Sequence, residues 1–152
     1  MGLSLDTIAF KNIELSLKDI EAVYPAEWAA VLAPQWLGLR NTSEVYGLYK
    51  NEVLLCIGII FTDKLPTPSA LELTHSQSFT AYDYLGYLYT IPEHRNQGRG
   101  SLWITHLIEL QVYPKLWLTI ESIDLSKFYT KNGFVFAIPI PHEAEEYIMY
   151  RG

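Results

Sequence analysis

The hydrophobic pattern at the start of the chain predicts one short strand followed by two helices. Strand-forming residues occupy Thr7 to Phe10, and Ser16 to Asp19 resembles a capped helix start that leads into apolar positions at helical spacing. A second helical stretch runs from Ala26 to about Leu32. Because proline lacks the backbone N–H that a helix interior needs, we expect Pro25 to separate these helices and Pro34 to interrupt the second.

Strand patterns dominate the middle of the chain. Glu44 to Tyr49 and Val53 to Thr62 are apolar or aromatic runs separated by three polar residues, which predicts an antiparallel hairpin. Asp63 to Ser69 contains two prolines and is expected to be a loop, since proline cannot donate to a sheet ladder. Tyr84 to Ile91 is a further strand, which Pro92 closes.

The last third alternates helices with short strands. Apolar positions after Gly100 recur with the period of a helix that ends before Pro114. The remaining expected elements are a buried strand at Leu116 to Ile120, a brief helix at Leu125 to Lys131 stopped by Asn132 and Gly133, and a strand pair at Phe134 to Ile138 and Tyr147 to Tyr150. We find no internal repeat or flexible linker, so residues 1–152 are expected to form a single domain.

The composition disfavours nucleic acid and membranes as partners and indicates the cellular location to expect. The 152 residues carry a formal net charge of −6, which disfavours a nucleic-acid-binding surface built on Lys and Arg. The longest apolar run, Val53 to Phe61, is much shorter than the roughly twenty residues of a membrane-spanning helix, so no membrane segment is expected. Cys56 is the single cysteine and is expected in the core rather than as a nucleophile. With no secretory signal at the N-terminus and no cysteine pair, the expected location is the cytoplasm.

One segment carries a pattern typical of an anion site. Leu88 to Ile91 ends a predicted strand, and the segment from Pro92 to Ser101 forms a glycine-containing turn that opens a helix. Backbone N–H groups at a helix start can hold a phosphate group, and glycine lets the backbone approach it closely. Trp103 stands where the dinucleotide-binding motif needs a third glycine, and no Gly-Lys-Ser/Thr follows as in a P-loop.

The sequence here resembles the GNAT superfamily of N-acetyltransferases. Arg95 to Gly100 reads Arg-Asn-Gln-Gly-Arg-Gly and matches the family's acyl-CoA pyrophosphate signature, which is Arg or Gln, two residues, Gly, one residue, and Gly or Ala. Farther on, Phe128 to Phe134 is similar to the family's Phe-Tyr-x-Lys-x-Gly-Phe segment. The resemblance covers about Tyr84 to Phe136 and implies an α/β fold with a mixed, mostly antiparallel sheet and helices on both faces, opened between the strands at 84–91 and 116–120.

The resemblance also implies a cofactor site for acetyl-CoA as acyl donor. The strand backbone should bond the pantetheine arm, and the turn should hold the pyrophosphate. The residues implied are Leu88, Tyr89, Thr90, Arg95, Asn96, Gln97, Gly98, Arg99, Gly100 and Ser101. Of the two arginines, Arg99 has the better claim to a phosphate contact because it lies within the turn. No histidine or acid stands at metal-ligand spacing, so no metal is expected.

The implied chemistry is direct attack of a primary amine on the thioester, with no covalent enzyme intermediate. Tyr129 aligns with the family tyrosine that protonates the departing thiolate, although the same residue could merely pack the short helix on the sheet. The family's strand carboxylate has no counterpart before Glu121, which is the candidate base, and Ser122 stands where many members have Asn. The other acceptors by position are Glu72, His75 and Asp83.

The sequence leaves the acceptor amine and three functional classes open. Alternation places Tyr87 and Tyr89 on one face of their strand, where they could line an acceptor pocket or simply pack the sheet. Besides an N-acetyltransferase, the chain could be an acyl-CoA-binding module of the same fold without efficient catalysis. It could also act by assembling with another protein or with itself as a homodimer.

Overall fold

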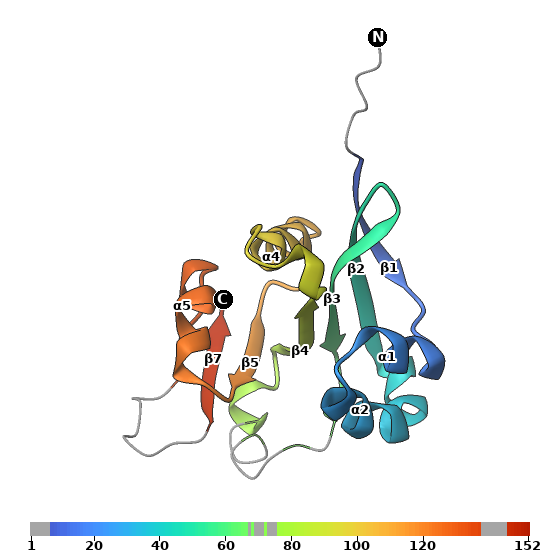
Figure 1. Cartoon of the computed structure of the whole chain (residues 1–152). Helices are drawn as coiled ribbons and strands as arrows, with labels where there is room; N and C mark the ends of the chain where they lie inside the picture. The colour runs from blue at the N-terminus through green and yellow to red at the C-terminus, as the bar shows by residue number, and fades with distance from the viewer. Residues whose placement is uncertain (1–6, 67, 69–71, 73–75, 138–145) are drawn as a thin grey trace.

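The computed structural model describes residues 7–66, 68, 72, 76–137 and 146–152. Within these residues the chain forms one seven-stranded sheet in the order β1-β2-β3-β4-β5-β7-β6 (Figure 1). The neighbouring strands are antiparallel apart from the parallel pair β4 and β5. The mixed, mostly antiparallel sheet expected from the sequence is therefore confirmed.

The element bounds follow most of the predicted pattern. The strands are β1 (Ile8–Ile13), β2 (Ser43–Lys50), β3 (Val53–Phe61), β4 (Asp83–Thr90), β5 (Leu116–Ile120), β6 (Val135–Phe136) and β7 (Tyr147–Arg151). The helices are α1 (Leu17–Val23), α2 (Ala26–Leu39), α4 (Arg99–Glu109) and α5 (Ser126–Lys131). The predicted strand pair near the C-terminus is confirmed as β6 and β7, while position 138 lies outside the described residues.

The expectation that Pro34 interrupts the second helix is wrong, because α2 continues through it to Leu39. Trp36, which follows Pro34, is 2% exposed, and its indole N–H donates to the backbone carbonyl of Leu15 at 2.6 Å. Burial of this side chain offsets the backbone hydrogen bond that the proline removes. The N-terminal helix is as predicted, since Ser16 and Asp19 form a complete capping box at the start of α1.

Two hydrophobic cores lie on the two faces of the sheet. The core under α1 and α2 includes Ile20, Leu32, Trp36, Ile57 and Trp117. The core under α4 and α5 includes Leu55, Ile60, Trp103, Leu107 and Phe134. In Figure 1, α1 and α2 lie together beside β1 to β3, whereas α5 lies beside β7 at the other end of the molecule. Helices on both faces are thus confirmed.

The parallel strands β4 and β5 pair over only two positions. Asp83 is opposite Leu116 and Tyr84 is opposite Trp117, and no further pair forms although both strands continue. A gap therefore opens between them beyond Tyr84 and Trp117, as the resemblance implied. In the described part of the chain, no helix combines the length and apolar character needed to cross a membrane.

Candidate active site

A β-bulge marks β4 where it leaves β5. Ile57 pairs with Tyr89 and Ile59 pairs with Gly86, so Tyr87 and Leu88 together stand opposite the single residue Gly58. Tyr87 has a φ of 55°, which is unusual for a residue that is not glycine. This bulge was not predicted from the sequence. The local signal that could have found it is Gly86, because a glycine inside a strand often marks one.

Side chains of the α1 and α2 face hold the bulge. The Tyr24 hydroxyl donates to the Tyr87 carbonyl at 2.8 Å, and the rings of Tyr24 and Trp28 pack against those of Tyr87 and Tyr89 at centroid distances of 5.5–6.0 Å. Tyr87 and Tyr89 therefore lie on one face as predicted. They pack against the helices and remain partly exposed.

The glycine-containing turn leads into α4 as the sequence predicted. Asn96 and Gly98 have φ values of 60° and 72°, and Gly98 is the N-cap of α4 with no side-chain capping bond. A Cβ added at Gly98 would meet nothing within 4 Å. The first N–H groups of α4 are thus not capped by a side chain, and the space beside Gly98 is open, which suits a phosphate group.

The two arginines of the turn lie in different surroundings. Arg95 bends back to the end of β4, where its Nε donates to the Thr90 carbonyl at 3.2 Å and its guanidinium stacks 5.3 Å from the centroid of the Tyr89 ring. Arg99 differs, because its Nε is buried and has no hydrogen-bond partner among the described residues. An unpaired buried donor beside the turn fits an anionic ligand.

Packing between α4 and α5 explains the second glycine of the motif. A Cβ at Gly100 would lie 2.9 Å from the Phe128 ring, so only glycine lets α5 approach α4 this closely. The Asn132 side chain then joins the helices by donating to the Ser101 hydroxyl at 3.1 Å. Gly100 and Ser101 therefore hold α5 against the turn, in addition to the phosphate role that the resemblance implies.

Tyr129 packs against the core under α4 and α5 and lies within electrostatic reach of Cys56 in β3 and Tyr84 in β4. Its ring packs edge-on between Phe128 and Phe134, with centroid distances of 4.9 and 5.6 Å. The hydroxyl has no hydrogen-bond partner among the described residues. Burial raises the pKa of Tyr129 above its ordinary value of 10, and the nearby Cys56 thiol raises it further. The phenol therefore stays protonated at neutral pH and can donate a proton.

The candidate bases differ in where they lie relative to the gap between β4 and β5. Glu72 accepts hydrogen bonds from Tyr84 of β4 and Thr119 of β5, so its carboxylate lies at the gap. Asp83 lies at the closed end of the strand pair. Glu121 follows β5 and is exposed. The pKa of Tyr87 is raised mainly by burial, and the charges of Glu72 and Glu121 raise it further. His75 lies outside the described residues.

Among the residues that the structure describes, no group of three or more His, Cys, Asp or Glu side chains could hold a metal ion.

Solved structures similar to this one include several acetyltransferases. The ribosomal-protein-S18-alanine N-acetyltransferase of Escherichia coli is 16% identical, with a TM-score of 0.62 over 95% of this chain and 93% of that one. An acetyltransferase of Bacillus subtilis in complex with CoA is 9% identical, with a TM-score of 0.65 over 95% and 98%. The PaiA N-acetyltransferase of Thermoplasma acidophilum, in complex with coenzyme A, is 14% identical, with a TM-score of 0.59 over 94% and 98%.

These likenesses show that the chain has the GNAT fold, which confirms the resemblance drawn from the two motifs. No family model matches the sequence, and no curated protein is significantly similar to it.

Proposed function

We propose that this protein is an N-acetyltransferase that moves an acetyl group from acetyl-CoA to a primary amine by direct attack in a ternary complex. The observation that supports the proposal most directly is the protonated Tyr129 phenol, which lies within electrostatic reach of Cys56 in β3 and of Tyr84, the residue at which β4 leaves β5. The glycine-containing turn at the start of α4 leaves from the end of that same strand β4. The N-acetyltransferase neighbours, two of them in complex with CoA, support the same activity.

The cofactor would lie along β4 and end at α4. The backbone of Leu88 to Thr90 follows the bulge and is suited to bonding the pantetheine arm. Asn96 to Ser101 would hold the pyrophosphate through the N–H groups at the start of α4. Arg99 would pair its unbonded Nε with a phosphate oxygen, while Arg95 would position the end of β4.

The chemistry would take place at the gap. A backbone N–H beside the bulge would stabilise the oxyanion that forms when the amine attacks the thioester carbonyl. Tyr129 would donate its proton to the CoA thiolate as the C–S bond breaks. Cys56 would take no part, because it is fully buried in β3.

Ligand binding and turnover test this proposal together. We expect acetyl-CoA to raise the melting temperature of the purified protein in a saturable manner, because a ligand that binds the folded state stabilises it by about 2.7 kcal/mol at 100 times its Kd. A panel of primary amines should then release free CoA thiol at rates above the no-amine control. Binding without turnover on any amine would support the acyl-CoA-binding module instead. An unchanged melting temperature would contradict both.

A further inference from the structure

The carboxylate of Glu72 bridges the two strands where they part. Glu72 Oε2 accepts hydrogen bonds from the Tyr84 hydroxyl at 2.5 Å and from the Thr119 hydroxyl at 2.8 Å. Tyr84 belongs to the last paired position of β4 and β5, and Thr119 lies two residues beyond Trp117, the other member of that pair. The carboxylate therefore lies over the beginning of the gap.

Glu72 and Tyr129 lie on opposite faces of the sheet. Tyr84 and Trp117 belong to the core under α1 and α2, and alternation along β5 places Thr119 on that same face. Tyr129 packs with the core under α4 and α5. Burial and then the charge of Glu72 raise the pKa of Tyr84 well above its ordinary value of 10, and Tyr129 adds a smaller contribution. Both groups are thus within electrostatic reach of the same phenol at the gap.

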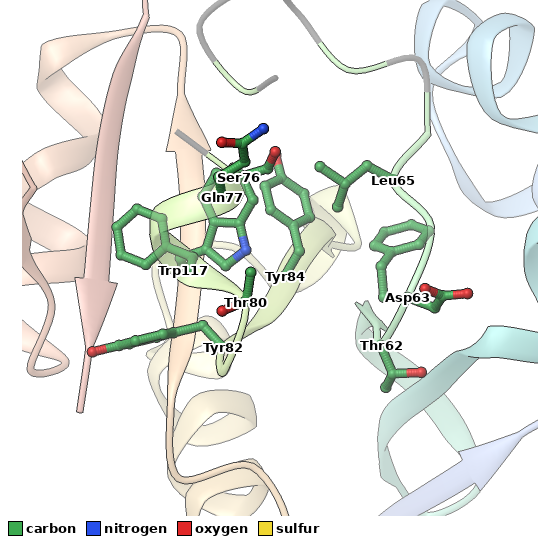
Figure 2. A pocket seen from close by; sticks show the side chains of 11 residues that line it. Thr62, Asp63, Leu65, Ser76, Gln77, Thr80, Tyr82, Tyr84 and Trp117 are labelled. Atoms are coloured by element: carbon green, nitrogen blue, oxygen red, sulfur yellow. The ribbon is translucent and has the colours of Figure 1, made fainter. Parts of the chain in front are cut away.

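A cavity of about 330 Å³ is lined by Tyr84 and Trp117, the last paired residues of β4 and β5. Figure 2 shows Leu65, Tyr84 and Trp117 around the hollow. The apolar and aromatic part of its lining consists of Phe61, Leu65, Phe79, Tyr82, Tyr84 and Trp117, and the polar part consists of Asp63, Thr62, Ser76, Gln77 and Thr80. The Tyr84 ring lines the cavity while its hydroxyl bonds Glu72, so the cavity and the carboxylate adjoin.

These surroundings favour one kind of ligand. Aromatic walls favour an apolar body, and aromatic faces also attract a cation. The Glu72 carboxylate, which is bonded to the hydroxyl of the lining residue Tyr84, can pair with an ammonium group, and Asp63 in the lining adds a second negative charge. The cavity volume is at the lower end of the range for small-molecule sites, which fits a small ligand.

We propose that Glu72 is the proton acceptor of the reaction, and that the acceptor substrate is a small primary amine attached to an aromatic or other apolar body. This inference rests on the function proposed above. Glu72 takes one proton from the substrate ammonium, and the neutral amine then forms the C–N bond while the thioester C–S bond breaks. The nitrogen then loses a second proton to solvent, and Tyr129, which gives its own proton to the thiolate, takes one back from solvent. The proton on Glu72 passes to solvent.

The decisive experiment compares two acceptors on the wild-type protein and on Glu72→Gln. The acceptors are 2-phenylethylamine, whose ammonium has a pKa of about 10 like a lysine side chain, and its β,β-difluoro analogue, whose fluorines lower the pKa of the ammonium towards neutrality. Removing a general base typically costs on the order of 100-fold. We therefore expect Glu72→Gln to reduce kcat/KM about 100-fold for 2-phenylethylamine and much less for the difluoro analogue, which is already largely neutral.

The glutamine variant retains the local structure, because its amide oxygen can still accept from Tyr84 and Thr119. Its melting shift with acetyl-CoA should match that of the wild-type protein. Glu109→Gln is the matched control, since this carboxylate is two-thirds exposed at the end of α4, and it should leave both rates unchanged. An equal loss on both amines in Glu72→Gln would overturn the base assignment. A selective loss in Glu121→Gln in place of Glu72→Gln would overturn it too.

A second comparison of two acceptor amines tests the proposed substrate class. Wild-type kcat/KM for 2-phenylethylamine should exceed that for ethanolamine, which lacks an apolar body, by about 10-fold or more. Burial of a few apolar groups in a pocket gives discrimination of this size. Equal rates, or acetyl-CoA binding without acetylation of either amine, would overturn the acceptor class. Failure to bind acetyl-CoA at all would instead contradict the proposed function.

Discussion

The hydroxyl of Tyr24, which follows α1, donates a hydrogen bond of 2.8 Å to the carbonyl of Tyr87 at the bulge of β4. This contact joins residues 63 positions apart and fixes the strand where it leaves β5. Tyr24→Phe should lower the free energy of unfolding by about 1 kcal/mol, the usual net value of one hydrogen bond. It should also slow acetyl transfer, because the bulge backbone loses a constraint.

Urea denaturation and turnover measure these two effects. Tyr82→Phe is the matched control for stability, since the Tyr82 hydroxyl bonds the Gly152 carbonyl in an exposed setting and should contribute less. Equal losses of stability in the two variants would mean that the Tyr24 bond has no special value.

Tyr129→Phe tests the proton donor. The ring keeps its packing against Phe128 and Phe134, so we expect an unchanged melting shift with acetyl-CoA. The rate constant kcat should fall about 100-fold, as removal of a general acid commonly causes. Tyr113→Phe removes another buried tyrosine hydroxyl, one that bonds Tyr46 instead, and should leave kcat near that of the wild-type protein. Full turnover in Tyr129→Phe would show that the thiolate leaves without this proton.

Two substitutions of Gly98 by side chains of nearly the same shape but different charge test the phosphate site. Its φ of 72° is a left-handed conformation that Asn and Asp adopt more readily than other side chains, and the space around its Cα is open. Gly98→Asn should therefore retain the conformation of the turn, and its acetyl-CoA affinity serves as the reference for the charged variant. Gly98→Asp has the same shape with a negative charge beside the phosphates and should weaken binding about tenfold or more, measured by calorimetry. Equal affinities would place the pyrophosphate elsewhere.

Gly58 lies opposite the bulge and under the Trp103 ring. A Cβ there would lie 2.5 Å from Trp103 Cζ2, inside a fully buried core. Gly58→Ala should cost about 1–3 kcal/mol of unfolding free energy, as overpacking does. Gly38 lies inside α2 with nothing within 4 Å of an added Cβ, so Gly38→Ala should instead stabilise by about 0.5–1 kcal/mol. Thermal unfolding of both variants should therefore give shifts of opposite sign.

Local signals in the sequence predicted much of this fold. Pro92 ends β4 and Gly98 begins α4, and both act through their own backbone preferences. The continuation of α2 past Pro34 could not be predicted in this way, because the burial of Trp36 against Leu15 is a tertiary contact. The same limit applies to the bulge at Tyr87, which depends on contacts with Tyr24 far away in the sequence.

The acceptor side of the site was harder to predict than the cofactor turn. The turn is one continuous segment, so its motif is visible in the sequence. Glu72 instead meets Tyr84 and Thr119, which lie 12 and 47 positions away. The sequence offers Glu72 as one of three further proton acceptors besides Glu121, which is the first candidate because it directly follows a strand. Only the folded chain brings Glu72 to the gap.

Cys56 should make the stability of the protein depend on alkaline pH. Burial raises the pKa of this thiol from 9.0 to about 11, although its hydrogen bond from Thr90 acts in the opposite direction. Because the folded state favours the neutral thiol, its contribution is fully present below pH 9 and is lost as pH rises through 11. The wild-type protein should therefore lose about 1.4 kcal/mol between pH 8 and 10 from this group alone, since one pKa unit corresponds to about that energy.

Urea denaturation of Cys56→Ala at the same pH values isolates this contribution. The variant should be less stable at pH 8, because it leaves a small cavity in the core, but its stability should fall less steeply to pH 10. The native wild-type thiol should also resist alkylation by iodoacetamide at pH 8 and react once urea unfolds the chain, because the reactive thiolate is scarce and shielded in the fold. Parallel pH slopes in the two proteins, or rapid alkylation of the native thiol, would contradict a buried and neutral Cys56.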